Sequence, residues 1–220
     1  MTKKIAIIDY QLGNLFSVQQ ACLYLGYDAK ITSDPFDIVN ADYAILPGVG
    51  AFADSMVNMK KLDLIEPIKD FVASGKPFMG ICLGLQLLLT ESEEFGNSKG
   101  LNLIEGVVKK FSNRDTKGDV LKVPQIEWNQ IYESNENAWE NTPLSICKQG
   151  DYMYFVHSFY AQPISSEVIL STTNYGGHHY CSSVQKDNVF ACQFHPEKSG
   201  QYGIKIYENW VNCSQLIKNK

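Results

Sequence analysis

The sequence predicts an α/β fold of three layers: a largely parallel central sheet with helices on both faces, and an added antiparallel layer. Two observations support this prediction. Through the first half of the chain, apolar runs of strand length alternate with segments of helix length, and the runs are almost entirely apolar. A parallel sheet produces such runs, because helices bury both of its faces. From about Gly106 the segments become shorter and alternate in polarity, which is typical of antiparallel strands.

Strands are expected where β-branched and other apolar residues cluster between turn signals. In the second half these signals include NYGG and KDN, which separate one short segment from the next. The expected strands of the parallel part cover 4–10, 27–32, 42–50 and 76–82, and those of the later layer cover 107–112, 152–162, 167–173, 180–186 and 189–194.

Helices are expected between the strands of the first half and at the end of the chain. Apolar residues recur at helical spacing over 15–25, and Gly26 stops that helix. A second helical stretch is expected from about Ala51 to Ser74, interrupted near Pro67 because proline removes a backbone donor. Further helices are expected over 83–92 and 201–217.

Length and composition limit the possible functions. The 220 residues favour one domain spanning 1–220, at about 100–200 residues per domain. A net charge of −5 with no basic stripe argues against a nucleic-acid partner. No apolar run suits a signal peptide or a membrane span, so we expect a cytoplasmic protein with no membrane partner. The six cysteines are then expected to be free thiols, and no motif suggests a metal or a cofactor.

The segment GICLGLQ, residues 80–86, places Cys82 between a predicted strand and a predicted helix. Such an abrupt turn strains its central residue, and the small neighbours Gly80 and Gly84 make room for it. The turn lifts the side chain at the carboxyl end of the sheet, where ligands of α/β proteins bind, and the start of a helix favours a thiolate. We therefore interpret Cys82 as a nucleophile. The alternative is a cysteine that only packs in the core, which is our interpretation of the other five.

A cysteine nucleophile requires a base and a group that orients the base. His195 ends an apolar strand in the segment ACQFHPEKS, and Glu197 follows two residues later. In an extended chain these two side chains point the same way, so Glu197 can hold one ring nitrogen while the other faces the sulfur. The alternative is a histidine in a surface salt link. Adjacent His178 and His179 point to opposite faces of a strand, and His157 is expected to be part-buried and hydrogen-bonded.

A thioester route passes through tetrahedral oxyanions, which need two preorganised hydrogen-bond donors. The backbone N–H of Leu83, at the expected helix start, is one candidate. The second is expected from LPGVG, residues 46–50, because this segment follows a neighbouring strand. Taken alone, LPGVG also fits a plain glycine turn.

Several motifs together resemble one enzyme class. PGVG at 47–50, GICLGLQLL at 80–88 and QFHPEKS at 193–199, in this order, resemble the motifs of class I glutamine amidotransferases. The likeness covers essentially the whole chain. Further segments make it closest to the glutaminase subunits of imidazole glycerol phosphate synthases, which serve histidine biosynthesis: DYQLGNLFSV at 9–18, VPQIEWN at 123–129, YFVHSF at 154–159 and VQKDN at 184–188.

The resemblance implies roles for individual residues. Cys82, His195 and Glu197 would form a catalytic triad that hydrolyses glutamine to glutamate through a cysteine thioester. Val49 would supply the second oxyanion amide beside Leu83. The substrate-binding positions carried over from the family are Gly48, Gly50, Gln86 and the backbone around Ser158 and Phe159.

The resemblance also implies a partner. Such glutaminases form a heterodimer with a (β/α)8-barrel synthase/cyclase subunit, which receives the ammonia through a channel and activates the glutaminase. Trp128, Tyr154 and Lys198 match positions at that docking face. In the family the loop that carries the second oxyanion donor can be flipped until the synthase binds its ligand, and glycines permit that change. We therefore expect low activity from the isolated chain.

The sequence departs from the family pattern at Gln125, Glu127 and Phe159, where histidine, glycine and tyrosine are common. These departures leave open a paralogous glutaminase that supplies ammonia for amidino-sugar formation in surface-polysaccharide biosynthesis. Two further classes are a catalytically silent partner-binding module and a stand-alone cysteine hydrolase. The intact Cys82 and His195 argue against the first, and the motifs VPQIEWN and YFVHSF have no obvious purpose in the second.

Overall fold

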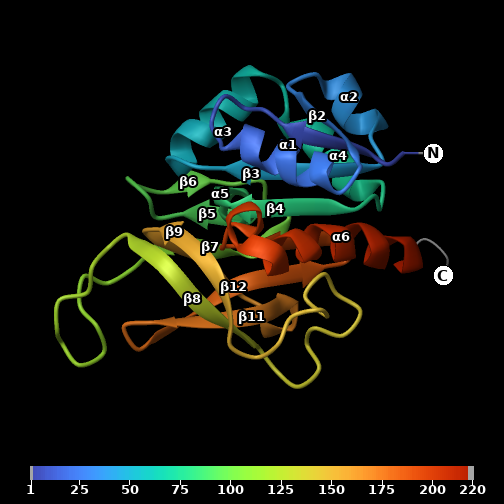
Figure 1. Ribbon diagram of the computed structural model, residues 1–220. Coiled ribbons are helices and arrows are strands. Elements are labelled where there is room, and N and C mark those ends of the chain that lie inside the picture. The colour runs from blue at the N-terminus through green and yellow to red at the C-terminus, as the bar shows by residue number, and fades with distance from the viewer. Residues whose placement is uncertain (1, 218–220) are drawn as a thin grey trace.

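The computed structural model describes residues 2–217 (Figure 1). Its first half, together with β13 from near the end of the chain, forms a parallel sheet with the strand order β2-β1-β3-β4-β13. Strands β3 and β4 lie in the middle, and every residue of both is buried. Such strands need helices on both faces, as the apolar runs predicted. The bounds of these strands are β1 (Lys4–Ile8), β2 (Asp28–Thr32), β3 (Tyr43–Gly48), β4 (Phe78–Cys82) and β13 (Val189–Cys192).

Alternate residues of each parallel strand pack into two separate hydrophobic clusters, one on each face of the sheet. In β1, Ile5 and Ile7 belong to one cluster, and Ala6 and Ile8 belong to the other. This division follows from the two-residue period of a strand. The first cluster includes residues of α1 (Leu15–Tyr24) and α6 (Gly200–Ile217), and the second includes residues of α2 (Pro35–Asn40), α3 (Phe52–Lys61) and α4 (Ile65–Ala73).

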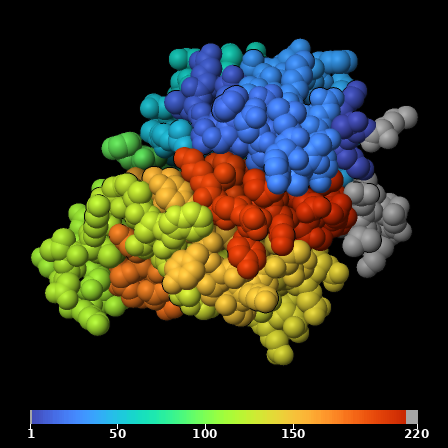
Figure 2. Space-filling model, in the orientation of Figure 1, coloured from blue at the N-terminus to red at the C-terminus, as the bar shows by residue number. Residues whose placement is uncertain are grey.

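The remaining strands extend the sheet mainly through antiparallel pairs. Strand β12 (His178–Lys186) pairs with β13, and the order continues through β10 (Phe159–Pro163), β7 (Ile104–Lys110), β5 (Leu89–Ser92) and β6 (Ser98–Lys99). A branch runs from β12 through β11 (Ile169–Tyr175) and β8 (Gln125–Glu133) to β9 (Asp151–His157). Short 3-10 helices cover Ser166–Val168 (η1) and Pro196–Lys198 (η2). In Figures 1 and 2, α6 lies between the parallel half and this antiparallel part.

The predicted α/β fold is confirmed, and the strand ending in 189–194 joins the parallel part of it. Strand β13 pairs in parallel with β4 on one side and antiparallel with β12 on the other. It therefore connects the two halves of the sheet. No helix within residues 2–217 is long and apolar enough to cross a membrane.

The predicted helix over 83–92 is wrong beyond its first half. Helix α5 spans only Leu83–Leu87, and the chain continues as β5. The residues Leu87, Leu88 and Leu89 are all fully buried, so hydrophobicity there has no helical period to distinguish the two structures. Pairing of β5 with β7 decides the outcome.

Two predicted boundaries also move. The break in the helical stretch 51–74 lies between α3 and α4, where Asp63 has a φ of 52°, and Pro67 lies in the first turn of α4. Proline is tolerated there because the early N–H groups of a helix have no partner within it. The single strand expected over 152–162 is two strands, β9 and β10, separated at Ser158 and paired with different neighbours.

Candidate active site

Cys82 lies at the junction of β4 and α5, in the strained turn that its glycine neighbours predicted. Its φ of 55° and ψ of −107° lie outside the regions that L-residues ordinarily adopt. A Cβ on Gly84 would lie 1.8 Å from the carbonyl oxygen of Leu46, so only glycine fits against the neighbouring strand β3. The Cys82 side chain lines an open pocket of about 1010 Å³, although only 5 % of the residue is exposed.

His195 and Glu197 form a buried pair. The distance between Nδ1 of His195 and Oε1 of Glu197 is 2.8 Å, and their side chains are 2 % and 1 % exposed. The contact is made through the 3-10 turn η2, because Glu197 is the middle residue of that turn and not part of the extended chain we expected. The backbone N–H of His195 donates to the carbonyl of Tyr154, which fixes the histidine against strand β9.

The electrostatics of this pair favour a charged ring. Burial by itself lowers the pKa of His195, but negative charge on Cys82 and then the interactions with Glu197 outweigh it and raise this pKa to about 10. The second ring nitrogen, Nε2, is buried and makes no hydrogen bond to any described residue, so we attribute the effect of Cys82 to its charge. The arrangement places a protonated imidazole ring near the Cys82 sulfur, with the Glu197 carboxylate behind the ring.

The pocket beside Cys82 contains most of the residues expected to bind substrate. Its lining includes four of the expected substrate-binding residues and both expected oxyanion residues. The former are Gly50, Gln86, Ser158 and Phe159, and the latter are Val49 and Leu83. Gly48 does not line this pocket. It is buried at the end of β3, and a Cβ there would approach the Tyr10 hydroxyl to 2.0 Å. The amide Nε2 of Gln86 donates to the carbonyl of Phe159 over 2.8 Å, which joins α5 to β10 across the pocket.

Two charged residues of the pocket were missed by the sequence analysis. The carboxylate of Glu94 accepts a hydrogen bond from the backbone N–H of Phe52 over 2.7 Å, and it thereby caps the start of α3. Lys110, exposed at the end of β7, lines the same pocket. No motif surrounds either residue. Glu94 is one of several acidic residues in TESEEFG, and Lys110 follows another lysine.

A third residue that lines the pocket, His157, has a different character. Its Nδ1 donates to the carbonyl of Phe159 over 2.8 Å, and its Nε2 lies 3.3 Å from the hydroxyl of Tyr180. Burial lowers the pKa of His157 to about 3, against the smaller opposing effect of the Phe159 carbonyl. It is therefore neutral around pH 7. We predicted a part-buried, hydrogen-bonded histidine, and the contacts agree.

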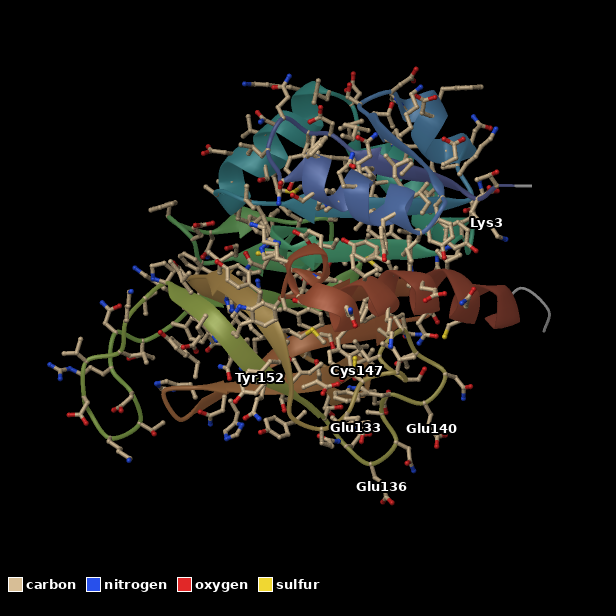
Figure 3. All side chains as sticks on the ribbon, viewed as in Figure 1. Lys3, Glu133, Glu136, Glu140, Cys147 and Tyr152 are labelled. Carbon is tan, nitrogen blue, oxygen red and sulfur yellow. The ribbon has the colours of Figure 1, made fainter. Side chains whose placement is uncertain are left out.

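The three residues expected at the docking face gather into one stack. Trp128 of β8 and Tyr154 of β9 are paired opposite each other, and their rings lie edge to face, 6.1 Å apart with an angle of 69° between their planes. Nζ of Lys198 lies 5.9 Å from the centre of the Tyr154 ring. Trp128 is 50 % exposed, as are its neighbours Ile126 and Tyr152 to similar extents. Figure 3 labels Tyr152 beside β8, in the antiparallel part.

The departures from the family pattern have different environments. Gln125 is fully buried, and its Oε1 accepts from the Tyr180 hydroxyl over 2.9 Å. Glu127 is exposed and accepts weak hydrogen bonds of 3.3 Å from Gln125 and Asn129. The adjacent histidines His178 and His179 have separate hydrogen-bond partners. Nε2 of His179 lies 2.9 Å from the side-chain amide of Asn174, and Nε2 of His178 lies 2.9 Å from the carbonyl oxygen of Arg114.

A strained cysteine at the carboxyl end of a parallel sheet, backed by a histidine–carboxylate pair, defines a class of enzymes that act through a cysteine nucleophile. Comparison with known families narrows this class. The family described as glutamine amidotransferase class-I matches residues 6–212, and the chain belongs to this family. The family predicted from the motifs is thus confirmed.

Individual relatives agree. The chain is 48 % identical to the imidazole glycerol phosphate synthase subunit HisH of Syntrophotalea carbinolica, over 94 % of this chain and 98 % of that one. It is 44 % identical to the subunit of the same name from Geobacter metallireducens, over 94 % and 97 %. Among solved structures, PurLQS from Thermotoga maritima has a TM-score of 0.72 at 18 % identity, covering 96 % of this chain and 99 % of that one, which supports the fold alone.

Proposed function

We propose that this chain is the glutaminase subunit of an imidazole glycerol phosphate synthase, acting as one glutamine amidotransferase domain over residues 1–220 in the cytoplasm. It hydrolyses glutamine to glutamate and passes the ammonia to a synthase subunit. The observation that carries the proposal is the strained Cys82 in the pocket wall, with the buried His195–Glu197 pair acting on its charge.

The reaction follows from the charges of these three side chains. The Cys82 thiolate attacks the carboxamide carbon of glutamine, and the resulting tetrahedral oxyanion collapses to a thioester as His195 gives its proton to the departing ammonia. His195 then takes a proton from water, which attacks the thioester carbon. The second oxyanion collapses to the thiolate and the γ-carboxyl group of the product, which releases its proton to solvent to give glutamate, and His195 is again protonated. Glu197 holds Nδ1 throughout and stabilises the imidazolium.

Two backbone N–H groups are assigned as the donors that hydrogen-bond to the oxyanion. Leu83 follows the nucleophile directly and begins α5, and Val49 follows β3, the strand beside β4. Each donor of this kind contributes about 2.7–4 kcal/mol to the stability of the transition state. Both residues line the pocket together with Cys82.

The charged groups of the pocket suit the two charged groups of free glutamine. Glu94 can face the α-ammonium group, and Lys110 can face the α-carboxylate. The assigned contacts to the rest of the substrate are Gln86 and the backbone of Gly48, Gly50, Ser158 and Phe159. A γ-glutamyl peptide carries the same two free α groups and differs at the amide nitrogen, so release of ammonia from free glutamine is the measurement that separates the two substrates.

Trp128, Tyr154 and Lys198 are assigned as the docking face for the partner. A (β/α)8-barrel synthase subunit covers this face in the heterodimer. Supporting this, the relatives are named as synthase subunits. The carbonyl of Tyr154 also accepts a hydrogen bond from the N–H of His195, and the N–H of Tyr154 donates to Ser199. Strand β9, which carries Tyr154, is therefore hydrogen-bonded to the segment that contains His195. Binding of a partner at β9 can therefore change the position of His195, which fits a glutaminase whose activity is low without its partner.

The test is reconstitution of the purified chain with an imidazole glycerol phosphate synthase barrel subunit and its nucleotide ligand. Ammonia release from glutamine should rise strongly on adding the partner and ligand, and should be lost in Cys82→Ala but kept in Cys147→Ser. Cys147 lines a different surface depression, and Figure 3 shows it in the antiparallel part. Activation by a partner from surface-polysaccharide synthesis, with none by this one, would reject the histidine-pathway assignment. Absence of ammonia release with either partner would reject the glutaminase.

A further inference from the structure

One buried polar side chain contacts the nucleophile and has no role in the mechanism above. Gln193 follows β13 and is fully buried. Its amide Nε2 lies 3.5 Å from Sγ of Cys82 in hydrogen-bond geometry. Its backbone N–H donates to the carbonyl of Ser182 over 2.9 Å, which fixes the residue against β12.

The orientation of this amide is set by a chain of contacts. The carbonyl of Phe159 can only accept, so the atom of Gln86 that faces it over 2.8 Å is the nitrogen Nε2. The same nitrogen donates to Oε1 of Gln193 over 3.1 Å. Because Gln193 presents its oxygen to Gln86, it presents its nitrogen, a donor, to the sulfur.

A donor at this place favours the anionic form of Cys82. A thiolate accepts a hydrogen bond from an amide N–H, and such bonds to charged groups are stronger than neutral ones. The carbonyl of Val156, 3.9 Å from the sulfur, can accept a hydrogen bond only from the protonated thiol. The buried position of Gln193 keeps water from replacing its contact.

We propose that Gln193 is a catalytic residue whose side-chain amide donates a hydrogen bond to the Cys82 thiolate, with its orientation fixed from the pocket through Gln86 and the Phe159 carbonyl. The inference rests on the proposed role of Cys82 as nucleophile. It adds a second source of stabilisation for the thiolate besides His195. It also gives Gln86 two functions, since that side chain both lines the substrate pocket and orients Gln193.

The test measures thiolate formation directly. The rate of Cys82 alkylation by iodoacetamide is followed against pH, in chains whose half-buried Cys147 and Cys213 are serine, and the modified peptide is identified by mass. Gln193→Met keeps the length and removes the donor, and it should shift the alkylation midpoint upward by about one pH unit, or about tenfold in rate on the acidic side. Gln193→Glu should shift it further, because a carboxylate repels the thiolate.

The matched control is Gln185→Met, which changes a glutamine of β12 at a pocket formed by Gly75 and Asn188 and not by Cys82. It should leave the midpoint where it is. Circular dichroism establishes folding, and should Gln193→Met be unfolded, Gln193→Glu decides. An unchanged midpoint in a folded Gln193 variant would overturn the proposal. The assay needs neither glutamine nor a partner, so its outcome is separate from that of the glutaminase test.

Discussion

The parallel and antiparallel parts of the sheet differ in how they bury their residues, and the site uses both. Strands β3 and β4 are buried along their whole length, and they hold Cys82 in a turn that few residue types fit. Strand β9 alternates between buried and more exposed residues and carries the partly exposed Tyr154, whereas β8 exposes three consecutive residues that end at Trp128. The rigid part thus positions the nucleophile, and the two-faced part offers a surface to a partner.

The two parts meet at His195. It follows β13, the strand that pairs with both halves, and its N–H is bonded to Tyr154 of β9. His195 can therefore act on Cys82 of the parallel part while its position depends on β9 of the antiparallel part.

The largest expected effect concerns the pair that backs the nucleophile. Glu197→Gln should lower kcat/KM of the reconstituted glutaminase by about 10³–10⁴-fold, because an amide cannot hold the Nδ1–H tautomer or stabilise the imidazolium as a carboxylate does. The measurement is ammonia release at saturating partner. Glu208→Gln, an exposed change on α6, is the control and should have no effect. A fall of less than about tenfold would show that Glu197 does not orient the base.

The next largest effect concerns the surface of β8 and β9 that is assigned to the partner. Trp128→Ala should weaken the affinity for the synthase subunit by about 30-fold, or about 2 kcal/mol, because an exposed tryptophan is a frequent centre of binding energy. Isothermal titration measures the affinity. Phe36→Ala, which removes an aromatic side chain of α2 that is 72 % exposed, should leave it unchanged. Equal effects of the two changes would place the docking face elsewhere.

A smaller effect depends on pH and on His157. Its pKa is about 3 in the folded chain, against an ordinary value of 6.5. Between these two pH values the unfolded chain binds a proton that the folded chain does not, so stability falls as pH falls from 6.5 toward 3, by up to about 1.4 kcal/mol per pH unit from this group.

Denaturant unfolding at a series of pH values checks this. His157→Gln should make the loss of stability toward acid pH less steep by roughly that slope, whereas His179→Gln, an exposed change on β12, should not. The same slope in His157→Gln and the wild type would mean that His157 is charged in the folded chain.

The smallest expected effect measures the strain of the parallel part. Glycine accepts the backbone angles of residue 82 more readily than alanine, so Cys82→Gly should be more stable than Cys82→Ala by about 1 kcal/mol. The usual order is the reverse, and Ala53→Gly in α3 should lose about 1 kcal/mol. Chemical denaturation of the three variants gives the comparison. A Cys82→Ala variant at least as stable as Cys82→Gly would show that the turn stores no strain.

Sequence reasoning located the nucleophile because its signal is local. Cys82 needs small neighbours and a strand before it, and all of these are adjacent in the chain. His195 and Glu197 were also found, but through a different geometry, because a 3-10 turn brings their side chains together. Glu94 could not be found in this way, since its place in the pocket depends on how the loop after β5 lies against α3.

The errors in secondary structure have the same physical origin. Leu87, Leu88 and Leu89 are buried on all sides, so their burial carries no period, and the partner strand β7 decides between helix and strand. Ser158 separates two strands because β9 and β10 pair with different neighbours, which the residues themselves do not encode. Tertiary pairing outweighed local preference in both places.

The most direct test of the account is covalent labelling with 6-diazo-5-oxo-norleucine, an electrophilic analogue of glutamine, in the presence of the synthase subunit. Mass spectrometry of the digested chain should find the adduct on the peptide containing Cys82, with labelling prevented by excess glutamine and absent in Cys82→Ala. An adduct on another residue, or undiminished ammonia release from Cys82→Ala, would contradict the assignment of Cys82 as the nucleophile.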